Sequence, residues 1–481
     1  MPTAHPSGWA HADGALRANR PGGPHWLREP RDPDALVPSL WPRTATKDDG
    51  VLSVGGVPLP ELVREHGSPA YVLDEADFRA RASAFRDAFA SYDVYYAGKA
   101  FLCTTVVRWL AEEGLSLDVC SGGELAVAER AGFPMERVGF HGNNKTVAEL
   151  ERAVGLGVGR VIVDSFHEIE RLAELTRPLV EEGSRGPARG PVGVMVRVTA
   201  GVEAHTHEYI ATAHEDQKFG FSIASGDALE AVRRVHAAPG LELLGLHSHI
   251  GSQIFDTSGF EVAARRVLAL HATVREAIGV EMPEIDLGGG FGIAYTTQDD
   301  PSEPAQLASE VTSIVEHECR ALGITVPRLS IEPGRAIVGP AMCTVYEVGT
   351  VKEVALDGGV VRTYVSVDGG MSDNIRTALY DADYSATIAS RPSGAEPALS
   401  RVVGKHCEAG DIVVKDEFLP GDVRPGDLVA VPGTGAYCRS MASNYNHALR
   451  PPVIGVRDGK TYTVLRRETE ADLFATDVGV S

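Results

Sequence analysis

The chain has 481 residues, a hydrophobic fraction of 43% and a formal net charge of −21 at pH 7. The hydrophobic fraction is ordinary for a globular protein and excludes a disordered chain, and the length predicts two or three domains, or one large barrel with an accessory domain. A surface this acidic repels phosphate backbones and anionic lipid surfaces, so neither a nucleic acid nor a membrane is expected as a partner.

The N-terminal segment and the cysteines indicate a protein that is neither exported nor membrane-spanning. No stretch approaches the roughly 18 apolar residues of a transmembrane helix. The first 50 residues are rich in proline and glycine and lack the apolar run of a secretory signal, so we expect a poorly ordered leader over residues 1–50. Six scattered cysteines without a C-x-x-C pair favour reduced thiols in a cytoplasmic protein over a disulfide framework or a zinc site.

A repeated order begins near residue 93, where short apolar runs alternate with amphipathic helical segments. Gly114 and Gly132 follow two of the helical segments, as expected of helix C-caps. Strands that alternate with helices imply parallel pairing, and eight such units predict a (β/α)8 barrel. The predicted strands are 93–97, 115–119, 138–142, 160–164, 192–198, 241–247, 284–288 and 328–332.

Beyond residue 340 the runs become short, rich in β-branched residues and separated by Gly, Pro and Asp. This pattern predicts an antiparallel β domain, a barrel or a sandwich, which the strand-like segment 51–60 could join. The predicted strands of this part are 343–351, 361–367, 411–414, 428–431 and 461–465. The expected division is a leader over 1–50, a strand segment of the β domain over 51–68, the barrel over 69–340 and the β domain over 341–481.

Polar groups follow nearly every predicted barrel strand, at the end where a barrel gathers its catalytic residues. Lys99 lies in an apolar, aromatic context that suits either a snorkelling surface lysine or a desolvated amine able to form a Schiff base. The glycine run 288–292 suits either a tight turn or a close backbone approach to a phosphate, and it lacks the third glycine of a dinucleotide loop. The candidate residues at the strand ends, which offer polar side chains or glycine backbone N–H groups, are Lys99, Asp118, Ser121, Arg197, His247, His249, Ser252, Gly288, Gly289, Gly290, Glu332, Gly334 and Arg335.

The histidines of the barrel offer a metal hypothesis and a cofactor hypothesis. His247 and His249 are two residues apart and could bind zinc from one face of a strand, as could His205 and His207. No nearby carboxylate completes either pair in the expected pattern, so we expect no metal, and a flat imidazole stacked on a planar cofactor is the better use for one of them. Glu332 ends an apolar strand and must be paired if buried, either with a protonated pyridine nitrogen or with Arg335.

The C-terminal part contains three further candidate segments. Arg376 and Tyr380 are four residues apart, on one face of a short predicted helix. Cys407 and Glu408 lie side by side before a predicted strand, where such a pair is more often structural than functional. Tyr437 lies in a glycine-rich segment that could close over a phosphate.

Together these motifs resemble the fold-type III pyridoxal-phosphate decarboxylases and, among them, the diaminopimelate decarboxylases. The resemblance extends from about residue 50 to the C-terminus. Its order and spacing are highly specific, although each motif alone is weak. The motifs are YYAGKA at 95–100, HSHIGSQ at 247–253, DLGGGFG at 286–292, EPGRAIVGP at 332–340, DGGMSDNIRTALY at 368–380, GKHCEAGD at 404–411 and GTGAYC at 433–438. The resemblance implies a barrel of the alanine-racemase type followed by a β domain.

The resemblance also assigns roles to residues at the matching positions. Lys99 is the residue that forms the Schiff base with pyridoxal 5′-phosphate, His249 stacks on the ring, and Glu332 keeps the ring nitrogen protonated. The phosphate is held by Ser252, by the backbone of Gly288 to Gly290, by Gly334 and Arg335, and by the hydroxyl of Tyr437, with Asp118 also at the cofactor. The substrate contacts are Arg335, Arg376, Tyr380, Glu408 and Tyr437, and Cys407 is the general acid.

The activity that this resemblance implies is decarboxylation of meso-2,6-diaminopimelate to L-lysine and CO2, the last step of lysine biosynthesis. A carboxylate rather than an arginine at Glu332 favours decarboxylation over racemisation, and the two arginines would recognise the distal carboxylate. The Cys407-Glu408 segment would enter the partner's active site, which implies a homodimer; Ala409 departs from the serine common at that position. The alternatives are an ornithine or arginine decarboxylase, a non-catalytic pyridoxal-phosphate carrier and a metal-dependent barrel hydrolase.

Overall fold

The computed structural model describes residues 23–24, 26–181, 191–200, 218–356 and 359–479. The chain divides into two compact units: residues 79–292 with 301–336 form one, and residues up to 78 with 293–300 and 337–481 form the other. We call them the barrel unit and the β unit. None of the helices described is long and apolar enough to cross a membrane.

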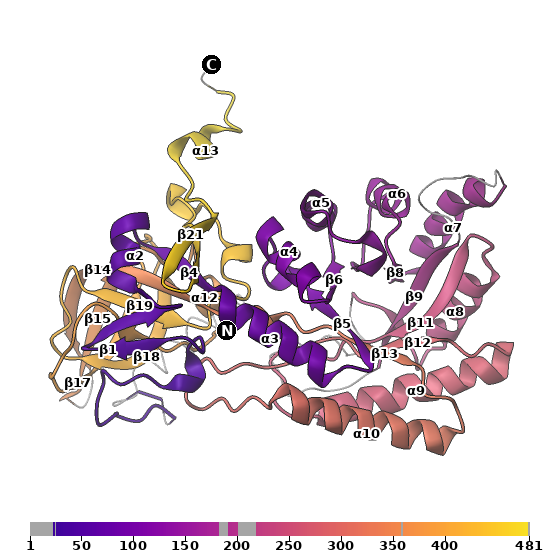
Figure 1. Cartoon of the computed structure of the whole chain (residues 1–481), viewed down its shortest axis with the longest axis horizontal. Helices are drawn as coiled ribbons and strands as arrows, with labels where there is room; N and C mark the ends of the chain where they lie inside the picture. Colours follow the sequence, from indigo (N-terminus) through magenta and orange to yellow (C-terminus); the bar gives the residue numbers. More distant parts are fainter. Residues whose placement is uncertain (1–22, 25, 182–190, 201–217, 357–358, 480–481) are drawn as a thin grey trace, which may run out of the picture. The chain divides into compact units, whose positions relative to one another are not determined.

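The barrel unit is built on a closed ring of parallel strands (Figure 1). All eight strands expected from the sequence are present, and the ring closes where β8 pairs with β9 and β13 pairs with β5. A short extra strand, β10 (Phe221–Ser222), pairs with β9. The ring strands are β5 (Tyr92–Ala97), β6 (Ser116–Val119), β7 (Val138–Phe140), β8 (Arg160–Val163), β9 (Val192–Thr199), β11 (Leu241–His247), β12 (Glu284–Asp286) and β13 (Arg328–Ile331).

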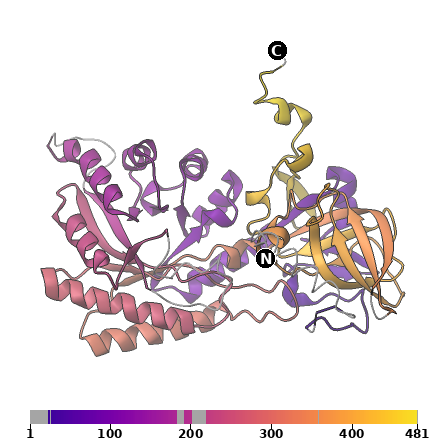
Figure 2. The same ribbon diagram turned by 180° about the vertical axis from the view of Figure 1, so that it is seen from behind.

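Helices connect the parallel strands and cover the outside of the ring, with α9 and α10 side by side in both views (Figures 1 and 2). Local sequence determines their ends. Thr146 and Glu149 form a capping box at the start of α6, and Gly132 and Gly157 end α5 and α6 in the left-handed conformation. The helices are α3 (Glu75–Ala88), α4 (Thr104–Glu112), α5 (Gly122–Ala131), α6 (Val147–Leu156), α7 (Phe166–Glu181), α8 (Asp227–Ala237), α9 (Ser258–Ile278), α10 (Pro304–Leu322) and α11 (Arg335–Val338).

The β unit contains a large sheet with the strand order β18-β17-β15-β14-β4-β20-β21, and β14 also pairs with β19, which pairs with β16. Most neighbours are antiparallel, as expected, but β15 pairs with β17 and β20 pairs with β4 in parallel, so the sheet is mixed. Its elements are β4 (Ala70–Asp74), β14 (Met342–Ala355), β15 (Val361–Val367), α12 (Arg376–Tyr380), β16 (Thr387–Ile388), β17 (Pro397–Val403), β18 (Ile412–Pro420), β19 (Leu428–Pro432), β20 (Val453–Arg457), β21 (Lys460–Leu465) and α13 (Glu470–Phe474).

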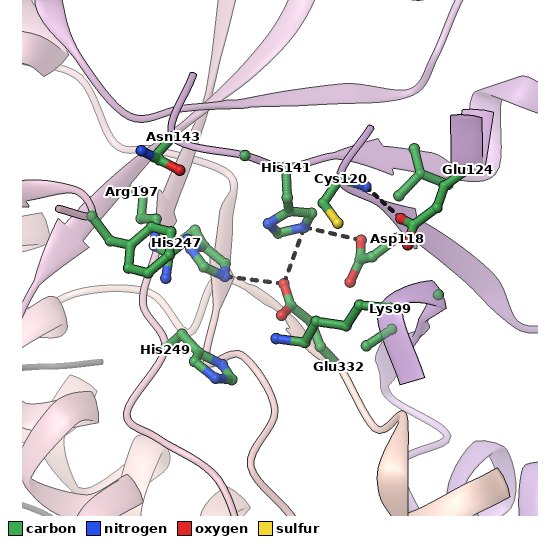
Figure 3. Close-up of a pocket in the computed structure, with 15 residues that line it drawn as sticks. Lys99, Asp118, Cys120, Glu124, His141, Asn143, Arg197, His247, His249 and Glu332 are labelled. Atoms are coloured by element: carbon green, nitrogen blue, oxygen red, sulfur yellow. Dashed lines mark hydrogen bonds and ion pairs between the residues drawn. The ribbon is translucent and has the colours of Figure 1, made fainter. Parts of the chain in front are cut away.

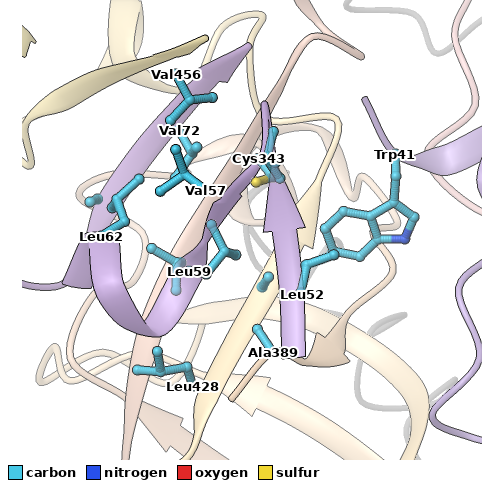
Figure 4. Packing of buried hydrophobic residues seen from close by; sticks show 14 of the residues in the cluster. Trp41, Leu52, Val57, Leu59, Leu62, Val72, Cys343, Ala389, Leu428 and Val456 are labelled. Carbon is cyan, nitrogen blue, oxygen red and sulfur yellow. The ribbon is translucent and has the colours of Figure 1, made fainter. Parts of the chain in front are cut away.

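The N-terminal region differs from the expected leader over its last part. A short helix turn (Pro38–Leu40) is followed by a three-stranded sheet of β1 (Thr46–Asp48), β2 (Val51–Val54) and β3 (Val57–Pro58), and then by α2 (Leu59–His66). Leu40 and Trp41 are buried in a hydrophobic cluster with residues of β2, β4, β14 and β20 (Figure 4). Leu40 and Trp41 thus anchor this segment to the β unit, although two apolar side chains are too few to form a periodic pattern in the sequence.

The β unit also takes a strand from the region expected to belong to the barrel. The barrel was expected to begin at residue 69, yet β4 pairs with β14 and β20 of the large sheet. Residues 293–300 belong to the β unit as well. β4 is buried along its whole length and carries no alternation of polar residues, so its sequence does not distinguish it from a barrel strand.

Candidate active site

A cavity of about 280 Å³ lies at the carboxyl ends of the barrel strands, where parallel barrels place their catalytic residues. Its charged and imidazole side chains come from six strands or the segments that follow them: β5, β6, β7, β9, β11 and β13 (Figure 3). Of the residues singled out in the sequence, Lys99, Asp118, Arg197, His247, His249 and Glu332 line it.

Lys99 lies immediately after β5, in a short helix turn over Gly98–Ala100. The hydroxyl of Tyr96 donates to the carbonyl of Phe101 at 2.8 Å, which holds this turn against the end of the strand. A side chain at position 98 would place its Cβ only 2.7 Å from the carbonyl oxygen of Asp118, so glycine lets the turn approach the neighbouring strand. Lys99 is exposed while the residues on either side of it are buried, so its amine is presented in the cavity.

Glu332 follows β13 and is surrounded by imidazoles. Its Oε1 lies 3.0 Å from Nε2 of His247 and 3.3 Å from Nε2 of His141 (Figure 3). Burial and the nearby Asp118 carboxyl raise the pKa of Glu332, but the two imidazoles outweigh them, and its pKa lies below the ordinary value. Glu332 is therefore an ionised, buried carboxylate at neutral pH.

Asp118 has the opposite behaviour; it lies near the end of β6, which β5 separates from β13 in the ring. Burial raises its pKa to about 8, more than the positive charge of Arg160 lowers it. Its Oδ1 lies 3.1 Å from Nε2 of His141. Of these two carboxyl groups in the cavity, Glu332 is thus charged at neutral pH and Asp118 is mostly protonated.

His249 is neutral and has a fixed orientation. Burial, followed by the charges of Lys99 and Arg197, lowers its pKa well below the ordinary value. Its Nδ1 accepts a hydrogen bond from the backbone N–H of Gly289 at 3.3 Å. A neutral imidazole can stack against a cationic heteroaromatic ring without charge repulsion, which is the use expected for it.

The glycine run after β12 is required for packing. Added Cβ atoms would lie 2.4 Å from the carbonyl oxygen of Ser248 at Gly288 and 2.3 Å from that of Glu332 at Gly289. The N–H of Gly288 donates to Asp286 at 2.7 Å, and that of Gly289 donates to His249. Two of the three backbone N–H groups expected at a phosphate therefore have partners inside the barrel unit.

A second expected part of the anion site is already assembled. Nη2 of Arg335 donates to the Ser252 hydroxyl at 2.8 Å, which joins the chain after β13 to the chain after β11. Gly334 lies close to Ala97, because a Cβ there would be 2.9 Å from the carbonyl oxygen of Ala97. An arginine and a hydroxyl beside a glycine-rich turn are suitable donors for a phosphate.

The remaining predicted residues belong to the β unit, where Arg376 is buried at the start of α12. Its Nη1 donates to the Tyr384 hydroxyl at 2.7 Å, and its guanidinium lies 4.7 Å from the centre of the Tyr295 ring. Burial lowers the pKa of Arg376, but Tyr295 and Tyr384 raise it by more than burial lowers it. The guanidinium therefore stays charged. Tyr380 ends the same helix and is half-buried. Tyr437, after β19, is half-buried with a φ of 63°, a conformation that non-glycine residues seldom adopt.

Cys407 and Glu408 are exposed in the turn between β17 and β18. The backbone N–H of Cys407 donates to Oδ1 of Asn446 at 3.2 Å, and the same oxygen lies 3.3 Å from Nδ1 of His406. His406 is buried, and its Nε2 lies 2.8 Å from the Ser372 hydroxyl. The turn thus exposes a thiol and a carboxylate, while hydrogen bonds of His406 and Asn446 hold its backbone in place.

Several cavity residues were not predicted from the sequence. His141, Gly142 and Asn143 follow β7, and Cys120, Glu124 and Phe219 also line the cavity. The rule that predicted the other strand-end residues also applies to His141, which lies inside the predicted strand 138–142 and ends its apolar part. The pair His205 and His207 lies outside the residues that the structure describes.

The chain is similar to known proteins over most of its length. Residues 75–339 match the pyridoxal binding domain of the pyridoxal-dependent decarboxylases. The chain is 55% identical over 452 residues to the diaminopimelate decarboxylase of Mycobacterium tuberculosis, an alignment that covers 92% of this chain and 98% of that protein. It is 44% identical over 433 residues to that of Bacillus subtilis, with coverage of 89% and 95%. A solved diaminopimelate decarboxylase from M. jannaschii in complex with L-lysine matches with a TM-score of 0.83 at 29% identity, covering 91% of this chain and 98% of that one.

Proposed function

The chain belongs to the diaminopimelate decarboxylase family of pyridoxal-dependent decarboxylases, and we propose that it converts meso-2,6-diaminopimelate to L-lysine and CO2 with pyridoxal 5′-phosphate. The observation that carries this proposal is the cavity in which an exposed lysine amine and a buried, ionised carboxylate occur together, Lys99 and Glu332. The first is the group that binds an aldehyde cofactor covalently, and the second is the group that holds a pyridine nitrogen protonated.

The residues of the cavity fit this cofactor. Glu332 Oε1 and both carboxyl oxygens of Asp118 are buried without a hydrogen-bond partner of good geometry among the described residues, so polar atoms remain to be satisfied. Lys99 would hold the aldehyde carbon, His249 would lie against one face of the ring, and Arg335 with Ser252 would hold the phosphate. When bound, pyridoxal phosphate supplies an electron sink for the electron pair that the departing carboxylate leaves behind.

Two side chains of the cavity govern its protons. Glu332 is ionised and would accept a hydrogen bond from the N–H of the cofactor ring, which would keep that nitrogen protonated and positively charged. Asp118 keeps its own proton at neutral pH and adds no second negative charge beside Glu332. A single negative charge on this side of the cavity matches a single positive charge on the cofactor.

Substrate recognition uses the arginines. The substrate carries a distal carboxylate and a distal ammonium, which ornithine and arginine do not combine. Arg376 is charged and held rigidly by Tyr384, so it can bind a carboxylate with little loss of conformational freedom. Arg335 and Tyr380 would also bind the substrate, and Glu408 would bind the distal ammonium. Ornithine would leave this arginine without a carboxylate partner, which would cost binding free energy. This cost is the basis of the discrimination against ornithine.

The proton that replaces CO2 is assigned to Cys407. A thiol in an exposed turn needs a second surface to become part of a water-excluded site, so we propose a homodimer in which this turn enters the partner's cavity. Mixing inactive Lys99→Ala and Cys407→Ala subunits should restore partial activity, because one mixed site then has both groups. The absence of recovery after verified subunit exchange would contradict the shared site.

The six free cysteines support a reducing compartment, and we propose the cytoplasm. The alternative function is an ornithine or arginine decarboxylase of the same fold. CO2 release measured with diaminopimelate, ornithine and arginine distinguishes the two: comparable turnover of ornithine would contradict the proposal, and strong preference for diaminopimelate would support it.

A further inference from the structure

We propose that the cofactor-free protein binds one divalent transition-metal ion such as Zn²⁺ through His141, His247 and Glu332, and that this ion and the cofactor exclude each other. The metal site stands on geometry alone. The mutual exclusion rests on the proposed function, because it requires Glu332 to be the partner of the ring nitrogen.

The distances between the donor atoms are those of a metal site. Nε2 of His247 and Nε2 of His141 lie 3.0 and 3.3 Å from the same oxygen, Oε1 of Glu332, and the three ligand atoms all lie within 4.8 Å of one another. Ligands bound to tetrahedral zinc at about 2.0–2.1 Å are roughly 3.3–3.4 Å apart. The two nitrogen–oxygen distances are therefore already close to those in a tetrahedral zinc site (Figure 3).

The donor atoms are also available. All three side chains are buried, and Nε2 of His141, Nε2 of His247 and Oε1 of Glu332 have no hydrogen bond of good geometry within the described structure. Two imidazoles and one carboxylate are a donor set that suits zinc and its neighbours in the first transition series.

The surroundings provide rigidity, an entry path and an open position. The two imidazole rings lie edge to face with centroids 5.0 Å apart, and the backbone N–H of His141 donates to the carbonyl of Val119 at 2.8 Å. Asp118 Oδ1, 3.1 Å from Nε2 of His141, could orient a water in the fourth position. The site opens into the cavity that Lys99 also lines, so an ion can enter from there.

This grouping differs from the pairing that the sequence suggested. His247 and His249 are two residues apart, but β11 ends at His247, and Nδ1 of His249 accepts from Gly289. The second imidazole comes instead from the end of β7, and the carboxylate comes from the end of β13. A three-ligand set drawn from three strands cannot be recognised from the spacing within one motif.

The test uses Zn²⁺ and Co²⁺ with the cofactor-free full chain, prepared by removing the cofactor with a competing amine. Calorimetric titration should give one Zn²⁺ per chain, and Co²⁺ should develop the visible absorption of a tetrahedral complex. His141→Ala should weaken Zn²⁺ binding by at least about tenfold, since the loss of even an outer-shell partner costs that much. His249→Ala, a cavity histidine outside the set, is the matched control and should bind Zn²⁺ as the wild type does.

Two results would overturn the proposal. Equal Zn²⁺ affinity in the wild type and His141→Ala would refute the site, whatever substrate the enzyme uses. For the exclusion, cofactor absorbance should recover more slowly when Zn²⁺ is present and normally in His141→Ala; a chain that holds Zn²⁺ and cofactor together would refute it. Failure of the decarboxylase proposal would show in CO2 release and leave the Zn²⁺ titration unchanged.

Discussion

The two units present their candidate residues in different ways. In the barrel unit Lys99, His249 and Glu332 line one cavity, and contacts between strand ends already orient the candidate side chains: Glu332 lies between two imidazoles, His249 accepts from Gly289, and Arg335 donates to Ser252. In the β unit Arg376 is equally fixed, but Cys407 and Glu408 are exposed in a turn.

The difference teaches where each part of the chemistry is preorganised. Cofactor binding requires charges held in fixed positions in a dry cavity, and the barrel strands supply those positions. A proton donor such as Cys407, which would approach from another surface, needs only to be exposed on a turn that hydrogen bonds hold rigid. The account therefore expects barrel variants to lose the cofactor signal together with activity, and variants of the Cys407 turn to lose activity alone.

The largest expected effect follows Lys99→Ala. Loss of the amine removes the covalent attachment of the cofactor, so activity should fall by more than about 10⁴-fold and the visible absorbance of the bound cofactor should vanish. The measurement is an absorbance spectrum beside a CO2 assay. A Lys99→Ala protein that kept the spectrum of the wild type would show that another group binds the cofactor.

Cys407→Ala should lower the rate by about 10²–10⁴-fold, the usual contribution of a general acid, while the cofactor absorbance stays unchanged. Cys319→Ala is the matched control, because Cys319 is a buried thiol of α10 away from the cavity residues. Undiminished turnover in Cys407→Ala would assign the proton to a different group.

Asn446→Ala sharpens the comparison within the β unit. It removes the oxygen that accepts from the backbone of Cys407, so the rate should fall by up to about tenfold, as expected for one hydrogen bond, with the cofactor spectrum unchanged. Asn446→Asp keeps the acceptor oxygen and should retain most of the rate. Because the φ of Asn446 is 50°, this variant separates a positioning role of the side chain from an effect of backbone strain at the residue. Equal losses in both variants would contradict a positioning role.

The last prediction concerns stability rather than rate. Burial raises the pKa of Asp118 to about 8 from the ordinary 3.8 of an aspartic acid, so between these values the folded state holds a proton that the unfolded state has lost. This contribution to stability is complete below about pH 4 and is lost as the pH rises toward 8, at about 1.4 kcal/mol per pH unit. Urea unfolding of the cofactor-free Asp118→Asn protein should show a less negative slope of unfolding free energy against pH; identical slopes would contradict the assignment.

Much of the barrel could be predicted from the sequence, because each strand is a separate apolar run with a turn signal after it. The β unit was harder. Neither β4 nor β17 shows a pattern that reveals its neighbours, and two pairings are parallel, which only the long connections of the fold determine. Trp41 and Leu40 lie in a Pro-rich stretch whose composition indicates disorder, although tertiary packing buries both.

The candidate site was predictable where a motif lies at one strand end, as for Lys99 and Glu332. His141 was missed because its role depends on two residues from other strands. The glycine run was expected to face a phosphate, whereas the close approach of Ser248 and Glu332 is what demands glycine there. Such contacts between distant segments are not encoded in local spacing.

The central claim is the substrate, and the most direct measurement is identification of the amino acid released when the pyridoxal-phosphate-loaded enzyme acts on meso-diaminopimelate. We expect L-lysine in equal amount to CO2, with ornithine turned over far more slowly. No lysine from diaminopimelate, together with rapid formation of a diamine from ornithine, would contradict it.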